Sequence, residues 1–458
     1  MSVVVDEIER RIGAAAVLRG DSVAERAVGY WDSSPMSALA IVRPRTTGQV
    51  SEILSLCYAA GQSVVTHGGR TGCVAGTTSS ASDLVLSLER MNRICEIDPL
   101  AGTVTAEAGA VLQTVQEEVR AAGFMLPLDL GARGSCTIGG NLATNAGGIN
   151  VIRYGMARAI TLGLEAVLPD GRVVSSLDKM LKNNAGFDLK QLFIGTEGTL
   201  GVITRAVLRL QPAPLSKNTA MAAVADFDRL TRLLNRLQAR LGGNLSAFEM
   251  MEGAYFRAVT ETGWHTAPMD RQHPYYVIWE ADGSDPARDD EHFQEVLEGA
   301  FEDGLIDDAV LPTSESQRQY LWAIRDDFEA ILQPEPVFLY DVSLSIGSIE
   351  RYVSEVKAAA ESLLPGSTVY AIGHVGDSNL HFFVQARSDA ADARERSDRA
   401  VYEPLKKYGG SISAEHGIGT EKKRWLEQSR SLEEIELMQL LKRAIDPRGS
   451  LNPGVVID

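Results

Sequence analysis

The chain has 458 residues, of which 45% are hydrophobic and 23% are charged, and its formal net charge is −17. This length predicts two or three domains, and the composition is typical of a globular protein with a substantial interior. The negative charge argues against a broad nucleic-acid or anionic-membrane surface, and no apolar run approaches the roughly 20 residues of a membrane helix.

The N-terminal residues and the cysteines bear on cellular location. Asp6, Glu7 and Glu9 are unlike the start of a secretory or transit sequence. The four cysteines form no C-x-x-C pair and are typical of reduced structural thiols. They are Cys57, Cys73, Cys95 and Cys136. We therefore expect a cytoplasmic protein.

The first quarter of the sequence predicts a helix over 6–18, a strand over 39–43, a helix over 47–60 and a strand over 63–66. A glycine-rich loop, His67 to Gly72, follows this strand, and Gly76 comes shortly after it. Such a turn at a strand end can align backbone N–H groups around a phosphate. It lacks the G-x-G-x-x-G spacing of a Rossmann dinucleotide fold, so we do not predict one.

Two further glycine-rich loops follow. Short β-type runs at 83–88, 93–97 and 103–107 and a helix over 111–122 precede the loop 131–148, and a third loop, 195–201, precedes the strand 202–210. Three such loops within about 200 residues indicate a large phosphate-bearing cofactor held mostly by backbone groups. A glycine-rich β fold with long turns is the simpler alternative.

The second half begins after Pro212-Ala213-Pro214, which closes the first domain. Strands and helices alternate over 219–301, and this pattern predicts an antiparallel sheet covered by helices on one side. From Ser314 a helix continues toward Ile331. It carries Arg325 in an otherwise apolar and acidic run, where a surface or ion-paired arginine is the simpler interpretation.

Three of the 7 histidines lie in two short stretches near the C-terminus. Two extended segments, 369–375 and 380–384, flank the turn 376–379. If these segments pair, His374 and His381 meet on one side, and Glu415 completes a three-ligand set suited to Zn²⁺ with an open position. His416 would lie beside the metal, free to move a proton. Ordinary, hydrogen-bonded turn and core histidines are the alternative.

Taken in order, the stretches 66–72, 131–148 and 195–201 resemble the FAD-binding domain of the vanillyl-alcohol oxidase superfamily. The later histidine and glutamate set resembles its D-2-hydroxy-acid dehydrogenase branch, which includes D-2-hydroxyglutarate dehydrogenase, D-lactate dehydrogenase and the flavin subunit of glycolate oxidase. The resemblance implies an α+β fold with a PCMH-type FAD-binding domain over 1–215, an antiparallel-sheet substrate (cap) domain over 216–400, and a C-terminal segment over 401–458 that returns to the FAD domain.

The resemblance also implies where FAD binds. The pyrophosphate would lie against the Gly68–Gly72 loop and the isoalloxazine ring near Gly134 to Asn145. Some relatives attach FAD covalently through a histidine at the position of Arg70, so we expect non-covalent FAD. The implied cofactor-binding residues are Thr66, His67, Gly68, Gly69, Arg70, Thr71, Gly72, Gly76, Gly134, Ser135, Thr137, Gly139, Gly140, Asn141, Asn145, Gly147, Gly148, Glu197, Gly201, Ile203 and Asn452.

The implied reaction oxidises a D-2-hydroxy acid to the 2-oxo acid. A metal on His374, His381 and Glu415 would bind the substrate oxygens and lower the pKa of the hydroxyl, and His416 would take its proton. Arg325, in a Leu-Trp-x-x-Arg motif, resembles the arginine that grips the C1 carboxylate. Asn379 would help to orient the substrate, and the C2 hydride would pass to flavin N5.

Two departures from the hydroxyglutarate enzymes bear on the substrate. Those enzymes hold the distal carboxylate with a threonine one helical turn after the arginine and a lysine in the following strand, where this protein has Glu329 and Leu339. An acid and an aliphatic group repel or ignore a second carboxylate. We therefore expect a monocarboxylic substrate, either D-lactate-like or longer and more apolar. The alternative is D-2-hydroxyglutarate.

Electrons would leave through a separate acceptor, either an electron-transfer flavoprotein, a quinone or a cytochrome, and relatives of this kind are often dimers. Three other classes remain open. A metal hydrolase or lyase would leave the glycine-rich loops unexplained. A non-catalytic FAD-binding subunit would not need the metal histidines. A flavin oxidase of alcohols or aldehydes that uses O₂ would generally work without a metal.

Overall fold

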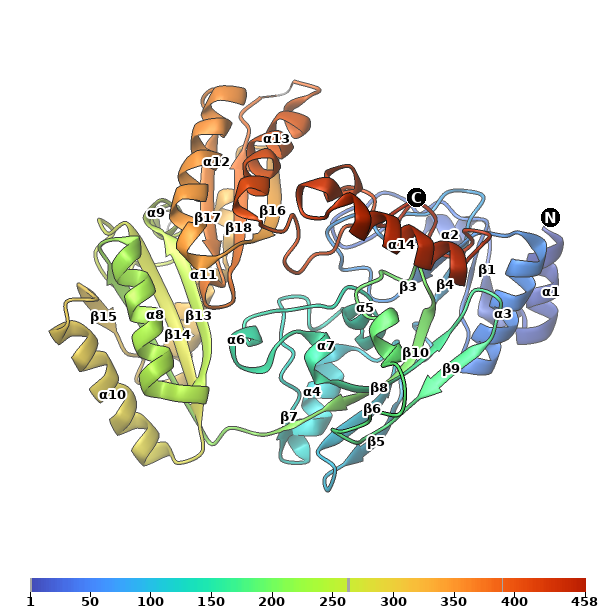
Figure 1. The fold of residues 1–458 in the computed structure, drawn as a ribbon, viewed down its shortest axis with the longest axis horizontal. Coiled ribbons are helices and arrows are strands. Elements are labelled where there is room, and N and C mark those ends of the chain that lie inside the picture. Colours follow the sequence, from blue (N-terminus) through green and yellow to red (C-terminus); the bar gives the residue numbers. More distant parts are fainter. Residues whose placement is uncertain (1, 262–263, 389) are drawn as a thin grey trace. The chain divides into compact units, whose positions relative to one another are not determined.

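The structure is a computed structural model that describes residues 2–261, 264–388 and 390–458. It divides into two compact units (Figure 1). The first contains residues 1–148, 155–213 and 415–458, and the second contains 149–154 and 214–414. The predicted C-terminal segment began at residue 401, inside the helix α13 (Ala393–Leu405), which packs against α12 (Ile349–Leu363) in the second unit. The polypeptide returns to the first unit at Glu415.

The first unit contains two main sheets. One has the order β1 (Val17–Leu18), β2 (Ala40–Val42), β4 (Leu84–Ser87), β3 (Val64–His67), with β2 and β3 parallel to β4 and β1 antiparallel to β2. The other is antiparallel, in the order β5 (Ile94–Asp98), β6 (Thr103–Glu107), β10 (Val202–Arg209), β8 (Thr161–Val167), β9 (Val173–Ser176). The short strands β7 (Phe124–Met125) and β11 (Gln211–Pro212) pair separately.

The helices of the first unit follow from local sequence. In α3 (Thr47–Ala60) the Thr46 side chain caps the N-terminus by accepting from the Gln49 N–H, and a left-handed Gly61 ends the helix. The predicted helix over 6–18 is shorter, because Gly13, with φ 90°, ends it. The remaining helices are α1 (Val3–Ile12), α2 (Asp21–Ala24), α4 (Leu112–Ala121), α5 (Ile138–Ala143), α7 (Ala157–Ile160) and α14 (Leu432–Ile445).

The second unit is built on a seven-stranded antiparallel sheet. Its order is β15 (Asp308–Val310), β12 (Ser216–Val224), β14 (Tyr275–Gly283), β13 (Leu245–Glu252), β17 (Thr368–Gly373), β18 (Asn379–Gln385), β16 (Val337–Ser343). The short helix α6 (Val151–Tyr154) comes from the excursion 149–154 and packs against β13. The sequence prediction of an antiparallel-sheet domain is confirmed.

Helices cover both faces of this sheet, so the prediction of a one-sided cover was wrong. The helices α9 (Gly253–Glu261) and α11 (Glu315–Asp326) share an apolar core with Ile278 and Phe383. The helices α8 (Phe227–Leu241), α10 (Pro286–Glu302), α12 and α13 pack on the opposite face, where Trp279 meets Phe293 and Phe382 meets Tyr352. Every residue of β13 is buried, which requires cover on both sides.

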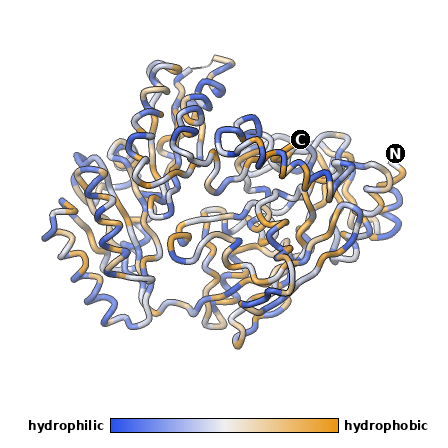
Figure 2. The backbone as a smooth tube through the Cα atoms, viewed as in Figure 1, coloured by the Kyte–Doolittle hydropathy of each residue, from blue (hydrophilic) through white to orange (hydrophobic). Residues whose placement is uncertain are grey.

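The outer helices alternate between hydrophilic and hydrophobic residues along their length, as expected when one face of a helix packs on a sheet (Figure 2). Among the residues that the structure describes, no helix combines the length and the apolar character that a membrane crossing requires.

Candidate functional site

The first two glycine-rich loops pack directly on one another in the first unit. A Cβ atom added to Gly68 would lie 2.6 Å from Thr137 Oγ1, and one added to Gly69 would overlap the Ser135 carbonyl oxygen. Side chains at 68 and 69 would therefore separate the loops, which explains the glycines physically. The sequence predicted both loops but not their contact, because they are about 65 residues apart.

Two threonine hydroxyls, one in β3 just before the first loop and one in the second loop, fit a polar ligand. Thr66 Oγ1 and Thr137 Oγ1 are buried, and neither has a hydrogen-bond partner among the described residues. A buried hydroxyl without a partner is unfavourable and is a frequent sign of a missing ligand or water. Their position beside the closely packed glycines fits the phosphate-bearing cofactor that the sequence predicts.

The side chains of His67 and Arg70 support the shape of the first loop. His67 is 2% exposed, and its Nε2 lies 2.8 Å from the Thr77 carbonyl oxygen. Burial lowers the pKa of His67 to about 4, so the ring is neutral. Arg70 has φ 55° and donates from Nη1 to the Ala27 carbonyl oxygen. Both side chains hold neighbouring backbone, which leaves the loop N–H groups to meet a cofactor.

The second loop ends against Glu415, within the first unit. A Cβ atom on Gly147 would lie 2.6 Å from Glu415 Oε1, so only glycine permits this approach. Asn145 accepts from the Arg158 N–H through Oδ1 at 2.9 Å, and Asn141 donates to Cys136 Sγ. The predicted flavin loop and a predicted metal ligand are therefore neighbours.

The third loop anchors the segment that follows His416. Glu197 accepts the Ile418 N–H at 2.6 Å and the Gly419 N–H at 2.9 Å, one on each carboxylate oxygen. Burial raises the pKa of Glu197. Asn452 donates to the Glu197 carbonyl oxygen and accepts the Thr66 N–H at 2.8 Å. Glu197, predicted as a cofactor contact, thus commits its carboxylate to the protein backbone.

The other predicted cofactor contacts lie in these three loops or in the elements that adjoin them. They are Thr71, Gly72, Gly76, Gly134, Gly139, Gly140, Gly148, Gly201 and Ile203. Ile203 is 5% exposed and pairs with Ala166 in the strand pair β10–β8.

The predicted histidine pair forms in the second unit. The strands β17 and β18 pair antiparallel, with His381 opposite Ile372, and His374 follows the end of β17. The two imidazole rings are 5.2 Å apart between centroids and nearly perpendicular, at 82°. The prediction that these histidines meet on one side of a hairpin is confirmed.

Glu249 lies between His374 and Arg325, and sequence reasoning missed it. Its Oε1 is 2.5 Å from His374 Nδ1, and its Oε2 accepts from Arg325 Nε at 3.0 Å and Nη2 at 2.8 Å. Burial alone would raise the pKa of Glu249, but the His374 and Arg325 charges and hydrogen bonds lower it to about 2. The signal was an acid in the middle of a largely apolar strand, which also ends in Glu252, since a buried charge needs a partner.

Asp341 was also missed. It lies opposite His381 in the pair β16–β18, and its Oδ1 is 3.9 Å from His381 Nδ1. Its Oδ2 accepts from Ser413 Oγ at 3.1 Å and from the Ala414 N–H at 3.0 Å. Glu415 and His416 are the next residues in the sequence, so Asp341 fixes the backbone from which they extend.

Asn379 begins β18 and is 3% exposed. Its Oδ1 and Nδ2 have no hydrogen-bond partner among the described residues. Residues two apart on a strand share a face, so Asn379 lies on the His381 side of the sheet. An amide with an unused donor and an unused acceptor beside the histidines fits the predicted role in orienting a polar substrate.

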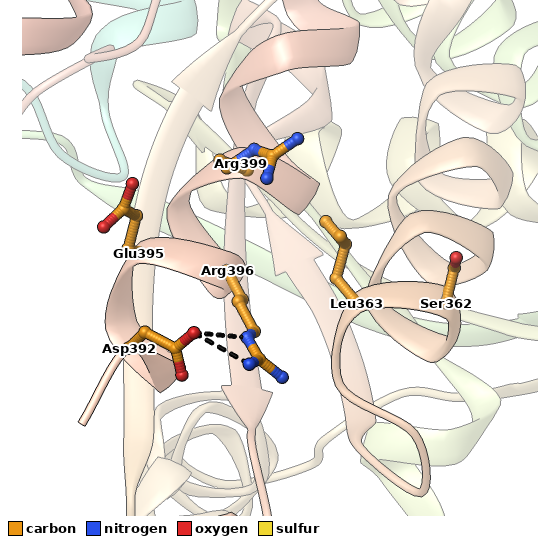
Figure 3. Close-up of a pocket in the computed structure, with 6 residues that line it drawn as sticks. All are labelled: Ser362, Leu363, Asp392, Glu395, Arg396 and Arg399. Carbon is orange, nitrogen blue, oxygen red and sulfur yellow. Dashed lines mark hydrogen bonds and ion pairs between the residues drawn. The ribbon is translucent and has the colours of Figure 1, made fainter. Parts of the chain in front are cut away.

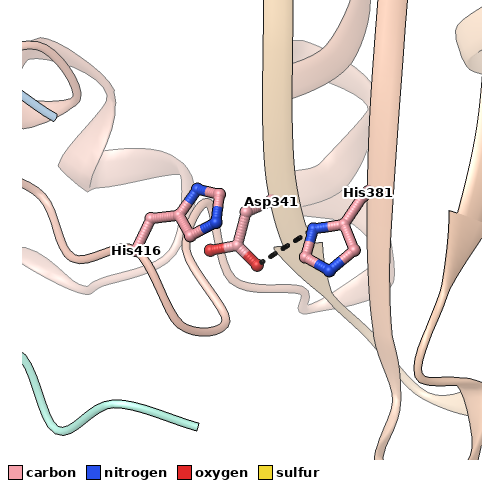
Figure 4. Close-up of side chains that lie close together, drawn as sticks. All are labelled: Asp341, His381 and His416. Carbon is pink, nitrogen blue, oxygen red and sulfur yellow. Dashed lines mark ion pairs between the residues drawn. The ribbon is translucent and has the colours of Figure 1, made fainter. Parts of the chain in front are cut away.

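Two groups of three side chains have the residue types of a metal site, and each group draws its members from both units. One group is His374, His381 and Glu415, as the sequence predicts. The other is Asp341, His381 and His416 (Figure 4). Two imidazoles with a carboxylate are a ligand set that suits Zn²⁺ and related divalent ions. Because Glu249 contacts Nδ1 of His374, a metal ion would bind at Nε2, in place of the hydrogen bond that Arg325 Nη2 donates to this atom at 3.3 Å. The residue types fit a metal ion.

A separate polar pocket lies at the ends of α12 and α13 (Figure 3). Its arginines are paired, Arg396 with Asp392 and Arg399 with Glu403. Each pair joins residues four positions apart in the sequence, so both arginines already have carboxylate partners.

The comparisons with known proteins agree with this geometry. Residues 38–176 match the family described as FAD binding domain, and residues 213–456 match the family described as FAD linked oxidases, C-terminal domain. The crystal structure of p-cresol methylhydroxylase with substrate bound has the same fold, with a TM-score of 0.78 and 17% identity, and the match covers 99% of this protein and 96% of that one. The fold and the loops thus define an FAD-dependent oxidoreductase with a PCMH-type FAD-binding domain.

Relatives narrow the class. The sequence is 39% identical over 419 residues to the mitochondrial D-2-hydroxyglutarate dehydrogenase of Bos taurus, in an alignment that covers 91% of this protein and 76% of the relative. It is 37% identical over 422 residues to a Schizosaccharomyces pombe protein named provisionally as a mitochondrial D-lactate dehydrogenase. That alignment covers 90% of this protein and 80% of the relative. The protein belongs to the FAD-linked oxidase family, in its D-2-hydroxyglutarate and D-lactate dehydrogenase branch. It is an FAD-dependent D-2-hydroxy acid dehydrogenase.

Proposed function

We propose that this dehydrogenase oxidises a monocarboxylic D-2-hydroxy acid whose side chain is apolar. The observation that carries the proposal is the row of residues next to His381 on the sheet. His381 and Asp341 are opposite one another, and two residues along the same strands Phe383 is opposite Leu339. Phe328 stacks on Phe383 with ring centroids 5.6 Å apart. A substrate side chain that extends from the histidines along this face meets aliphatic and aromatic groups.

The predicted site residues suit the reactive end of such a substrate. The Arg325 side chain is 11% exposed and can pair with the C1 carboxylate, while Asn379 can donate to and accept from the substrate oxygens. An imidazole nitrogen of His416 takes the proton of the 2-hydroxyl group. When bound, FAD supplies the hydride acceptor, and a divalent ion on His374, His381 and Glu415 supplies Lewis-acid polarisation of the hydroxyl.

D-2-hydroxyglutarate is the second candidate, and the names of the relatives support it better than they support a monocarboxylic acid. Against it stand Glu329 and Leu339, at the positions where the hydroxyglutarate enzymes have a threonine and a lysine. Glu329 is exposed in the turn Phe328–Ile331, and Leu339 is half-buried against the apolar core. A distal carboxylate placed there would lie near a like charge and an apolar group.

We expect kcat/KM for D-lactate, or for a branched aliphatic D-2-hydroxy acid, to exceed that for D-2-hydroxyglutarate by at least tenfold, equivalent to about 1.4 kcal/mol. The measurement is steady-state kinetics with an artificial electron acceptor. Equal or higher kcat/KM for D-2-hydroxyglutarate would instead establish the second candidate. The double variant Glu329→Thr with Leu339→Lys tests the assigned positions, because it should shift the ratio toward D-2-hydroxyglutarate.

We propose that FAD is bound without a covalent link, since the Arg70 side chain pairs with the Ala27 carbonyl oxygen and no histidine stands at that position. Denaturation in acid or urea, followed by filtration, is expected to release all of the yellow colour into the filtrate. Colour that stays with the precipitated protein would contradict this assignment.

The remaining functional assignments rest on the resemblance alone. We propose a separate electron acceptor, which could be an electron-transfer flavoprotein, a quinone or a cytochrome, and a homodimeric assembly. The proposal of a cytoplasmic location comes from the residues and not from the resemblance; the names of the Bos taurus and Schizosaccharomyces pombe relatives place those proteins in mitochondria.

A further inference from the structure

We propose that Glu249 is a positioning residue that couples the metal ligand His374 to the substrate-binding Arg325. The proposal deepens the proposed function, because it rests on the assignment of His374 to the metal and of Arg325 to the C1 carboxylate. Glu249 is not itself one of the predicted metal ligands or substrate contacts. It acts through the two side chains that do.

The geometry accounts for both carboxylate oxygens. Glu249 is 0% exposed, so water does not compete for it. One oxygen is 2.5 Å from His374 Nδ1, and the other accepts two hydrogen bonds from Arg325. The first contact holds the imidazole so that Nε2 is presented, and the second fixes the plane of the guanidinium. A carboxylate behind a ligating histidine also raises the basicity of that ligand.

Charge gives the same residue a second effect. Arg325 Nη2 donates to His374 Nε2 at 3.3 Å, so a divalent ion on Nε2 would replace this hydrogen bond and lie close to a guanidinium in a buried setting. Like charges at such separation repel strongly where water is excluded. A buried carboxylate between them offsets that repulsion, which allows a metal ion and a carboxylate-binding arginine to share one site.

An amide in place of the carboxylate cannot serve both partners. A glutamine at position 249 has one acceptor oxygen and one donor nitrogen. If its oxygen faces His374, its NH₂ group faces the N–H donors of Arg325, and the reverse orientation presents a donor to His374 Nδ1. Glu249→Gln therefore loses one contact in either orientation, and it removes the compensating charge in both.

The protein offers a matched control in Glu280. This carboxylate is 2% exposed on the neighbouring strand β14 and also holds an arginine of α11, with Arg318 Nη1 at 2.8 Å. It accepts from Trp322 Nε1 at 2.7 Å, and its other partners are Thr219 and Lys217. Glu280→Gln thus removes a buried charge from the same sheet, where it faces the same helix, without touching His374 or Arg325.

The experiment titrates metal-free protein with Zn²⁺ alone, in competition with a chromophoric chelator, and measures KM at saturating Zn²⁺. For Glu249→Gln we expect Zn²⁺ affinity to fall 10- to 100-fold, the range typical for loss of a partner behind a metal ligand, and KM to rise. For Glu280→Gln we expect an altered melting temperature with Zn²⁺ affinity and KM within about threefold of wild type, because it contacts neither site residue. If Glu249→Gln fails to fold, Glu249→Asp is titrated against the same criteria.

The outcomes separate this proposal from the proposed function. Wild-type protein that binds no Zn²⁺ would overturn the metal assignment and the coupling together. If wild-type protein binds Zn²⁺ and Glu249→Gln has the same Zn²⁺ affinity and the same KM, the proposed coupling is overturned while the metal assignment stands. Equal losses in Glu249→Gln and Glu280→Gln would reduce Glu249 to a structural acid and overturn the proposal as well.

Discussion

Replacing His416 with alanine is expected to slow reduction of the flavin by the D-2-hydroxy acid about 10²- to 10⁴-fold, the range typical for loss of a general base. FAD and metal should stay bound, because the substitution leaves the glycine-rich loops and the three predicted ligands intact. Anaerobic stopped-flow mixing, followed at the flavin absorption band, measures the rate directly. His292→Ala, at an exposed histidine of α10, is the control and should reduce at the wild-type rate.

The backbone around His416 is held on both sides, so removal of the imidazole should act locally. Asp341 accepts the Ala414 N–H, and Glu197 accepts the Ile418 and Gly419 N–H groups. A variant that reduces at close to the wild-type rate would place the base elsewhere. A variant that loses its metal would point to the other ligand group, Asp341, His381 and His416, in which His416 is a ligand and not a base.

The parts of the fold that could be predicted are those set by local pattern. The helix 47–60 and the strand 103–107 have the predicted bounds. The signals that set these bounds are the residue pattern of each segment and the residues immediately beside it. The histidine hairpin could be predicted for the same reason, since its turn is short. The packing of helices on both faces of the substrate-domain sheet could not be predicted, because it depends on which face of the sheet each helix packs against, and the helices are distant in sequence.

The roles of the carboxylates Glu249 and Asp341 could not be predicted from the sequence, for a physical reason. Glu249 and His374 are 125 residues apart, and Asp341 and Ala414 are 73 residues apart. No turn or spacing rule joins such pairs. The register of β13 with β17 brings Glu249 to His374, and the bridge between Ser343 and Ser411 brings Asp341 to Ala414. A buried acid in a largely apolar strand indicates that a partner exists but does not identify it.

Loss of the metal is expected to stop flavin reduction while leaving the flavin bound. The predicted FAD loops belong to the first unit, and their glycine contacts and threonine hydroxyls do not involve His374 or His381. Treatment with a chelator should therefore abolish flavin reduction without removing the yellow colour of the bound flavin. Added Zn²⁺ should restore flavin reduction. Flavin absorbance, metal content and reduction rate, measured on the same sample, test the three parts of this expectation.

In the variant His381→Ala, added Zn²⁺ is not expected to reverse the loss of the metal and of flavin reduction. His381 belongs to both groups of candidate ligands, so its removal leaves neither group with three members. Metal affinity should fall by more than the roughly 10- to 100-fold typical of a supporting residue, and Zn²⁺ should fail to restore flavin reduction. Reduction that survives in His381→Ala, or in chelated wild-type protein, would mean that Arg325, Asn379 and His416 suffice to position and deprotonate the hydroxy acid, as in a metal-free flavin oxidase. Restoration by Zn²⁺ in the wild type alone would instead make the imidazole at 381 the ligand on which the reaction depends.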